Sequence, residues 1–68
     1  MKKILIAVPC FNEEETIAKC LSNLINEKSN IKDYLVEILV VNDGSTDSTH
    51  DILKTFNEEI IVLNSMIN

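Results

Sequence analysis

Asp43 is the acid of this chain whose surroundings best suit a ligand contact. It follows an apolar run that ends at Val41, and it precedes Gly44 and the small polar residues 45–49. A carboxylate there can accept a hydrogen bond from the ring N–H of a base such as uracil. The alternative is structural, because an Asp shortly before a helix can cap its first amides.

A second polar stretch, 9–13, follows an earlier apolar run in the same way. Backbone groups beside Pro9 can pair with the carbonyl edge of a base, and Asn12 and Glu13 can hold a ribose or fix the loop. Each side chain again has a structural alternative. Asn12 is a good N-cap with Glu15 three positions later, as in a capping box, and Glu13 suits the helix dipole.

Three apolar, β-branched runs predict the strands that position these stretches, over 3–8, 35–41 and 60–63. Pro9 is expected to end the first strand because it lacks a backbone donor. Nearly continuous apolar runs are typical of parallel strands that are covered on both faces. Two short helices are too few to cover both faces, so we expect some apolar surface to stay open.

The helices are predicted from periodicity and capping residues. The apolar stripe of the first helix, predicted over 13–26, repeats at intervals of three and four residues, and it consists of Ile17, Leu21, Leu24 and Ile25. Ser45 or Thr46 is expected to cap a second helix. The inward residues of this second helix are Ile52, Leu53 and Phe56. The order β-α-β-α-β predicts an α/β fold, half of a doubly wound, mostly parallel, Rossmann-like sheet.

In such a sheet both polar stretches emerge at the carboxyl edge, where open α/β sheets bind their ligands. The chain has one glycine, Gly44, which excludes the dinucleotide fingerprint and the P-loop, since both need several. A nucleotide would therefore be held through its base and ribose.

Composition narrows the class further. A net charge of −5 argues against nucleic-acid binding, and no apolar run is long enough for a membrane span. Without a secretory pattern we expect a cytoplasmic protein, or one at the cytoplasmic face of a membrane. Cys10 and Cys20 lack metal-ligand spacing and are expected to be reduced thiols, with Cys20 beside the core stripe and Cys10 in the first loop. No metal site is predicted in this chain.

The stretches 6–14 (IAVPCFNEE) and 37–47 (EILVVNDGSTD) resemble the start of glycosyltransferase family 2. The resemblance covers nearly the whole chain. It implies the GT-A fold, a nucleotide-diphospho-sugar donor, most simply of the UDP type, and nucleotide contacts from Pro9, Asn12, Glu13 and Asp43.

Two departures from the family pattern matter. Where the family usually has Asp-Asp-Gly-Ser, this chain has Asn42 in place of the first Asp. The chain also contains no Asp-x-Asp metal motif and no counterpart of the later catalytic base. The resemblance implies a divalent metal, Mn or Mg, for the full-length enzyme.

We therefore expect residues 1–68 to be one partial domain, the N-terminal nucleotide-sugar-binding segment of a GT-A glycosyltransferase. The full enzyme would transfer a sugar, in the hexosyl-transfer class, to an acceptor hydroxyl, while the isolated chain would be inactive. The alternative is a non-catalytic α/β nucleotide-binding or structural module that self-associates. Either a missing C-terminal portion or a homo-oligomer would cover the remaining apolar surface. A receiver-like signalling domain is disfavoured, because it needs an acidic pair where this chain has Pro9-Cys10.

Overall fold

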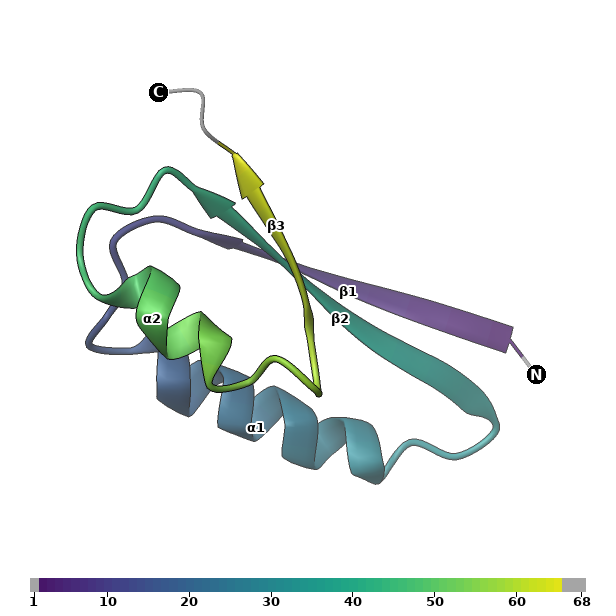
Figure 1. The fold of residues 1–68 in the computed structure, drawn as a ribbon. Helices are drawn as coiled ribbons and strands as arrows, with labels where there is room; N and C mark the ends of the chain where they lie inside the picture. Colours follow the sequence, from purple (N-terminus) through teal and green to yellow (C-terminus); the bar gives the residue numbers. More distant parts are fainter. Residues whose placement is uncertain (1, 66–68) are drawn as a thin grey trace.

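A computed structural model describes residues 2–65, which form a three-stranded parallel sheet and two helices. The strands are β1 (Lys2–Cys10), β2 (Tyr34–Asp43) and β3 (Ile61–Ser65), in the spatial order β1-β2-β3 (Figure 1). The helices are α1 (Ile17–Ser29) and α2 (Thr49–Lys54). This confirms the predicted β-α-β-α-β fold.

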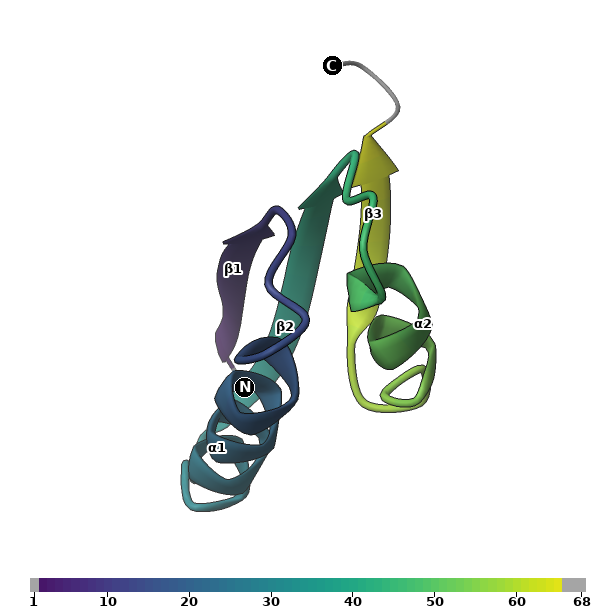
Figure 2. The same ribbon diagram turned by 90° about the vertical axis from the view of Figure 1, so that its left-hand side faces the viewer.

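Both helices lie on the same face of the sheet. Figure 2 shows α1 nearer β1 and β2, and α2 nearer β3. This follows from the topology, because two successive right-handed crossovers that progress in one direction place both helices on one side. None of the described helices is long and apolar enough to cross a membrane.

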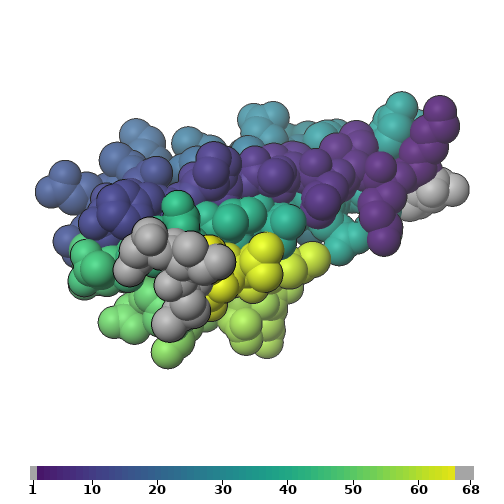
Figure 3. Space-filling model, turned by 90° about the horizontal axis from the view of Figure 1, so that it is seen from above, coloured from purple at the N-terminus to yellow at the C-terminus, as the bar shows by residue number. Residues whose placement is uncertain are grey.

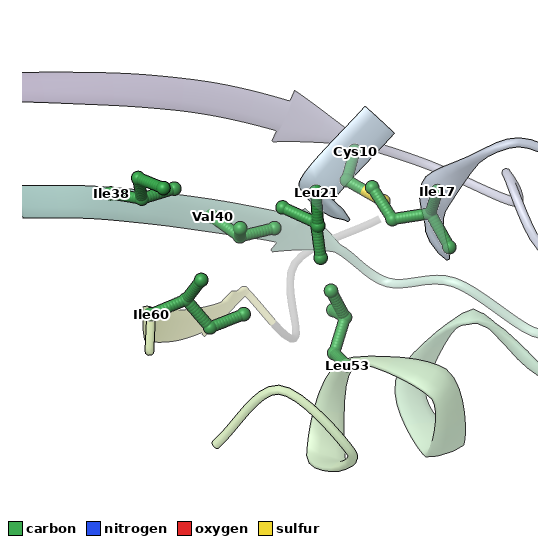
Figure 4. Close-up of a cluster of buried hydrophobic side chains, with 7 residues drawn as sticks. All are labelled: Cys10, Ile17, Leu21, Ile38, Val40, Leu53 and Ile60. Atoms are coloured by element: carbon green, nitrogen blue, oxygen red, sulfur yellow. The ribbon is translucent and has the colours of Figure 1, made fainter. Parts of the chain in front are cut away.

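The core lies between this face and the helices (Figure 4). Val40 of β2 lies near Leu21 of α1, and Ile17 of α1 lies beside Cys10 (Figure 4). Ile17, Leu21, Val40 and the neighbouring Ile38 of β2 are each at most 1% exposed. Leu53 of α2 closes the same cluster. The predicted apolar stripe of α1 is thus confirmed as its buried face.

Neither described helix lies over the opposite face of the sheet, which we call the open face (Figure 3). Side chains alternate between the two faces of a strand, and four leucine and isoleucine side chains here are about half exposed. These are Leu5, Leu35, Ile61 and Leu63, with exposed fractions of 48–56%. The expected uncovered apolar surface is therefore present in the described part of the chain.

Both helices begin later than predicted. Helix α1 starts at Ile17 rather than at residue 13, after a turn in which the Thr16 and Ile17 amides donate to the Glu13 carbonyl. It then continues to Ser29, beyond the predicted end at residue 26. Helix α2 starts at Thr49, so neither Ser45 nor Thr46 is its N-cap, and Phe56 packs on the core from the turn that follows it.

The first and second strands are longer than predicted, and β3 is shifted to later residues. Pro9 does not end β1 but pairs with Val41 of β2; this is tolerated because β1 is an edge strand with one neighbour. Cys10 is therefore the last residue of a strand and is buried, not part of a loop. Cys20 is exposed, so its predicted place beside the core was wrong.

Candidate functional site

The two loops at the carboxyl edge are hydrogen-bonded to each other. Loop 1 (residues 11–16) follows β1, and loop 2 (residues 44–48) follows β2. The Asn12 side-chain oxygen accepts from the amides of Thr46 at 2.7 Å and Asp47 at 3.3 Å. Asn12 is therefore not the cap of its own helix, as one prediction had it. It adopts a left-handed φ of 48°, which Asn tolerates better than most residues.

Backbone donors of loop 1 bind side chains that follow β2. The Asn12 amide donates to the Ser45 hydroxyl at 3.0 Å, and the Glu13 amide donates to the Thr49 hydroxyl at 2.9 Å. The Glu14 amide donates to the Asp47 carboxylate at 3.3 Å. The helix was predicted to begin at residue 13, which would place the acids of loop 1 in its first turn. They instead precede α1, which begins at Ile17.

Pro9 and Asp43 come to the same side of the sheet. Pro9 is the register partner of Val41, and Asp43 lies two residues further along β2. Because side chains of a strand alternate, Pro9, Val41 and Asp43 all belong to the open face. Asp43 is exposed, and within residues 2–65 its carboxylate has no hydrogen bond or ion pair. It does not cap α2, which was the structural alternative.

Asn12 and Glu13 lie apart from that pair. They line a hollow of about 280 Å³ together with Glu14 and Asp47, and neither Pro9 nor Asp43 is part of its lining. The structure thus brings together two of the four predicted residues, Pro9 and Asp43. It places the other two at the junction of the loops.

Asp47 is held as a carboxylate by this junction. Partial desolvation acts to raise its pKa, but hydrogen bonds from the Thr49 side chain, the Thr49 amide and the Glu14 amide outweigh it and lower the pKa. Asp47 therefore acts as an acceptor for loop 1 as well as for the first amide of α2.

A second hollow, of about 240 Å³, lies between the ends of β2 and β3. Four of its six lining residues, Asn42, Ser45, His50 and Asn64, carry polar side chains that were not among the predicted nucleotide contacts. Asn42 is only 4% exposed, and it directly faces Asn64 in the parallel register. The Asn42–Asn64 pair could have been predicted only from the register of β3, and this register depends on where β3 begins.

Cys10 is unsuited to nucleophilic chemistry. Burial raises the pKa of its thiol, and the negative charges of Glu13 and Asp47 raise it further. The thiol is thus protonated near neutral pH, the reverse of the activation that a helix N-terminus can produce.

The acids of the described residues do not assemble a metal site. No group of three or more His, Cys, Asp or Glu side chains within residues 2–65 is placed to hold an ion. Because catalytic metal sites need several such ligands, the divalent metal implied by the resemblance does not fit these residues, and we derive no step through it.

Sequence comparison identifies the protein family of this chain. The model of glycosyl transferase family 2 matches residues 5–68. The chain therefore belongs to glycosyltransferase family 2, and its strands and helices are consistent with the N-terminal part of a GT-A fold.

The relatives are much longer proteins. The chain is 39% identical to poly(ribitol-phosphate) beta-glucosyltransferase of Bacillus spizizenii, over 97% of this chain and 11% of that protein. It is 45% identical to glycosyltransferase GlyA of Streptococcus pneumoniae, over 82% of this chain and 8% of the relative. A prophage bactoprenol glucosyl transferase homolog of Escherichia coli is 45% identical over 75% of this chain and 16% of its own length. No solved structure matches the chain.

Proposed function

We propose that residues 1–68 form the nucleotide-binding segment of a glycosyltransferase that moves a sugar from a nucleotide-diphospho-sugar to an acceptor hydroxyl. The observation that carries this proposal is the placement of Pro9 and Asp43 on one side of the carboxyl edge, with the Asp43 carboxylate exposed and unpaired within residues 2–65. Family membership and the names of the relatives support glycosyl transfer.

Asp43 is proposed to accept the ring N–H of uracil. A carboxylate is an acceptor only, so it selects a base that presents a donor at this position. Phe11 lies next to the end of β1 and is 56% exposed, although it is a large apolar side chain. Its ring is available to stack on the base, as aromatic side chains do in nucleotide sites.

Asn12 and Glu13 have different proposed parts. The Asn12 side-chain oxygen already accepts two amides of loop 2, so its contribution is to hold the two loops together beneath the nucleotide. The exposed Glu13 carboxylate remains able to accept hydrogen bonds from ribose hydroxyls.

The diphosphate requires groups that this chain does not supply. The net charge is −5, and residues 2–65 hold no metal-ligand group. We propose that Mn or Mg, together with the base that deprotonates the acceptor, is supplied by other parts of the full-length enzyme. That enzyme would act in the cytoplasm, or at the cytoplasmic face of a membrane. The isolated chain is then expected to bind a nucleotide without turnover.

Calorimetric titration with UDP and CDP tests the base contact. Cytosine lacks the ring N–H that Asp43 is proposed to accept, so UDP should bind more tightly than CDP. Asp43→Ala should weaken UDP binding about tenfold or more, the usual loss for a hydrogen bond to a charged group. The same substitution should leave CDP binding little changed and so remove the preference.

The control is Glu27→Gln, which removes one exposed negative charge on α1, away from the loops. Its UDP affinity should match that of the parent chain. If Asp43→Ala binds UDP as tightly as this control does, Asp43 is not a base contact. Product from UDP- or GDP-sugars with manganese would overturn the separate expectation that the isolated chain is inactive.

The open face favours a second candidate, a module that self-associates. Leu5 and Leu63 are each 56% exposed on a sheet face without a helix, and such surfaces commonly mark interfaces. Sedimentation would show concentration-dependent dimers that Leu63→Lys abolishes. A monomer at all concentrations would contradict this candidate.

A further inference from the structure

Asn42 is one of two buried polar side chains in the described part of the chain, and both of its side-chain atoms are used. Its amide nitrogen donates to the Asn64 side-chain oxygen at 3.1 Å, and its oxygen accepts from the Ser45 hydroxyl at 2.5 Å. Ser45 in turn accepts from the Asn12 amide at 3.0 Å. We call these four residues, Asn12, Asn42, Ser45 and Asn64, the Asn42 network.

The Asn42 network spans all three strand ends. Asn64 lies in β3, Asn42 near the end of β2, Ser45 in loop 2, and Asn12 beyond the end of β1. Asp43 lies between Asn42 and Ser45 in the sequence, and the next residue, Gly44, has a φ of 69°. The backbone that carries Asp43 is therefore fixed on both sides by members of the network.

The chemistry at position 42 requires an amide. One atom must donate to Asn64 while the other accepts from Ser45, and only an amide side chain of this size does both. A carboxylate keeps the acceptor but loses the donor, and it adds a buried charge directly next to Asp43. Leucine has the same branching as asparagine, is somewhat larger, and loses both functions.

We propose that Asn42 is a positioning residue of the nucleotide site: through Ser45 and Asn64 its amide holds loop 2 so that the Asp43 carboxylate is presented to the base. This inference rests on the proposed function, and it adds residues that neither family membership nor the predicted base contact required. Asn42 itself does not face the base, because it points to the helix-covered side while Asp43 belongs to the open face.

Asn42→Leu separates positioning from folding. The leucine side chain is apolar and suits a buried position. Both former partners of Asn42, Ser45 and Asn64, can turn to solvent, so the thermal midpoint should change little. UDP affinity should fall about tenfold, equivalent to one lost hydrogen bond. Asn64→Leu should give a similar loss, whereas Asn64→Asp keeps the acceptor for Asn42 and should retain most of the affinity.

The control is Asn23→Leu, the same substitution on the exposed surface of α1. A second readout does not depend on nucleotide: hydrogen exchange of the Thr46 and Asp47 amides, which donate to Asn12. Their exchange should accelerate in Asn42→Leu and not in Asn23→Leu.

The outcomes are distinct. Unchanged exchange in Asn42→Leu overturns the inference whether or not UDP binds. Faster exchange with unchanged UDP affinity also overturns it, because the loop would then be held without effect on the ligand. Failure of the parent chain to bind UDP overturns the proposed function and the nucleotide role of Asn42 with it, and the exchange rates would then still report that Asn42 orders loop 2. Faster exchange with weaker binding supports the inference.

Discussion

Loops 1 and 2 occupy equivalent places, each between a strand and a helix, yet they contribute opposite chemistry. Loop 1 supplies three consecutive amide donors, those of Asn12, Glu13 and Glu14. They donate to side-chain oxygens of loop 2 and of the first residue of α2. Loop 2 and the start of α2 supply the acceptors. In return, a single side chain of loop 1 accepts two amides of loop 2.

In this fold the polar residues that follow a strand need not cap the helix that comes after them. Neither α1 nor α2 has a side-chain hydrogen bond from its N-cap residue. Asn12 and Ser45, which are suited to capping, instead accept from amides of the neighbouring loop. Asp47 accepts both from loop 1 and from the first amide of α2. As a result the two loops act as one rim, which keeps the ends of β1 and β2 at fixed positions relative to each other.

The largest effect is expected from Asn12, the one side chain that loop 1 contributes to the junction. Asn12→Ala removes the acceptor of two amides and of the Thr46 hydroxyl, and it leaves Ala in the left-handed region. We therefore expect a loss of about 3 kcal/mol in the free energy of unfolding. Asn12→Gly loses the same bonds but tolerates the φ, and it should lose about 1 kcal/mol less. Urea denaturation measures both values.

Asn30→Ala is the matched control, because Asn30 is exposed beyond α1 and has an ordinary φ of −92°. It should cost less than about 0.5 kcal/mol, as surface substitutions usually do. If Asn12→Ala costs no more than Asn30→Ala, the junction does not depend on the Asn12 side chain. Equal losses for Ala and Gly at position 12 would show that the positive φ carries no cost.

The sequence allowed the architecture to be predicted because it is encoded locally. Runs of β-branched residues mark the strands, and the stripe that includes Ile17 and Leu21 marks the buried face of α1. Because the carboxyl ends of parallel strands lie at the same edge of a sheet, Pro9 and Asp43 could be predicted to lie at one edge without knowledge of any contact.

The details of the rim were not predictable in the same way. Asn12 is chemically suited both to cap α1 and to accept amides from loop 2, which is 34 residues away in the sequence. Only the packing of the strands decides between these partners. The pairing of Asn42 with Asn64 likewise depends on the register of β3, whose predicted start was one residue too early.

Thr49, the first residue of α2, tests the contact between the loops from the acceptor side. It is fully buried, and its hydroxyl accepts the Glu13 amide of loop 1. Thr49→Val keeps the shape but leaves that amide without its acceptor, so we expect a loss of about 1–2 kcal/mol in the free energy of unfolding. Thr55→Val is the control, because Thr55 is exposed and, within residues 2–65, its hydroxyl bonds only to the Ile52 carbonyl of its own helix turn. Equal losses for the two valine variants would contradict the loop contact.

The smallest effect is expected from the charge of Asp47, which can be removed by acid without a mutation. Its pKa is lowered in the folded chain, although partial desolvation opposes this, because Thr49 and Glu14 donate hydrogen bonds to the carboxylate. The stability that it contributes is therefore fully present above the unfolded value of about 3.9, and it is lost as the pH falls through the lower folded value. Asp47→Asn lacks this dependence on pH.

The measurement compares the urea midpoints of the parent chain and Asp47→Asn at pH 6 and near the acid limit of folding. The parent chain should be the more stable at pH 6, and the gap should narrow in acid as the Asp47 carboxylate becomes protonated. Asp51→Asn removes an equal charge from α2 while keeping both loop contacts, and it separates the loss of these contacts from the change in net charge. A gap that is the same at both pH values would mean that the Glu14 and Thr49 amides are held equally well by a neutral side chain. Loop 1 would then depend on the shape of its acceptors in loop 2 and not on their charge.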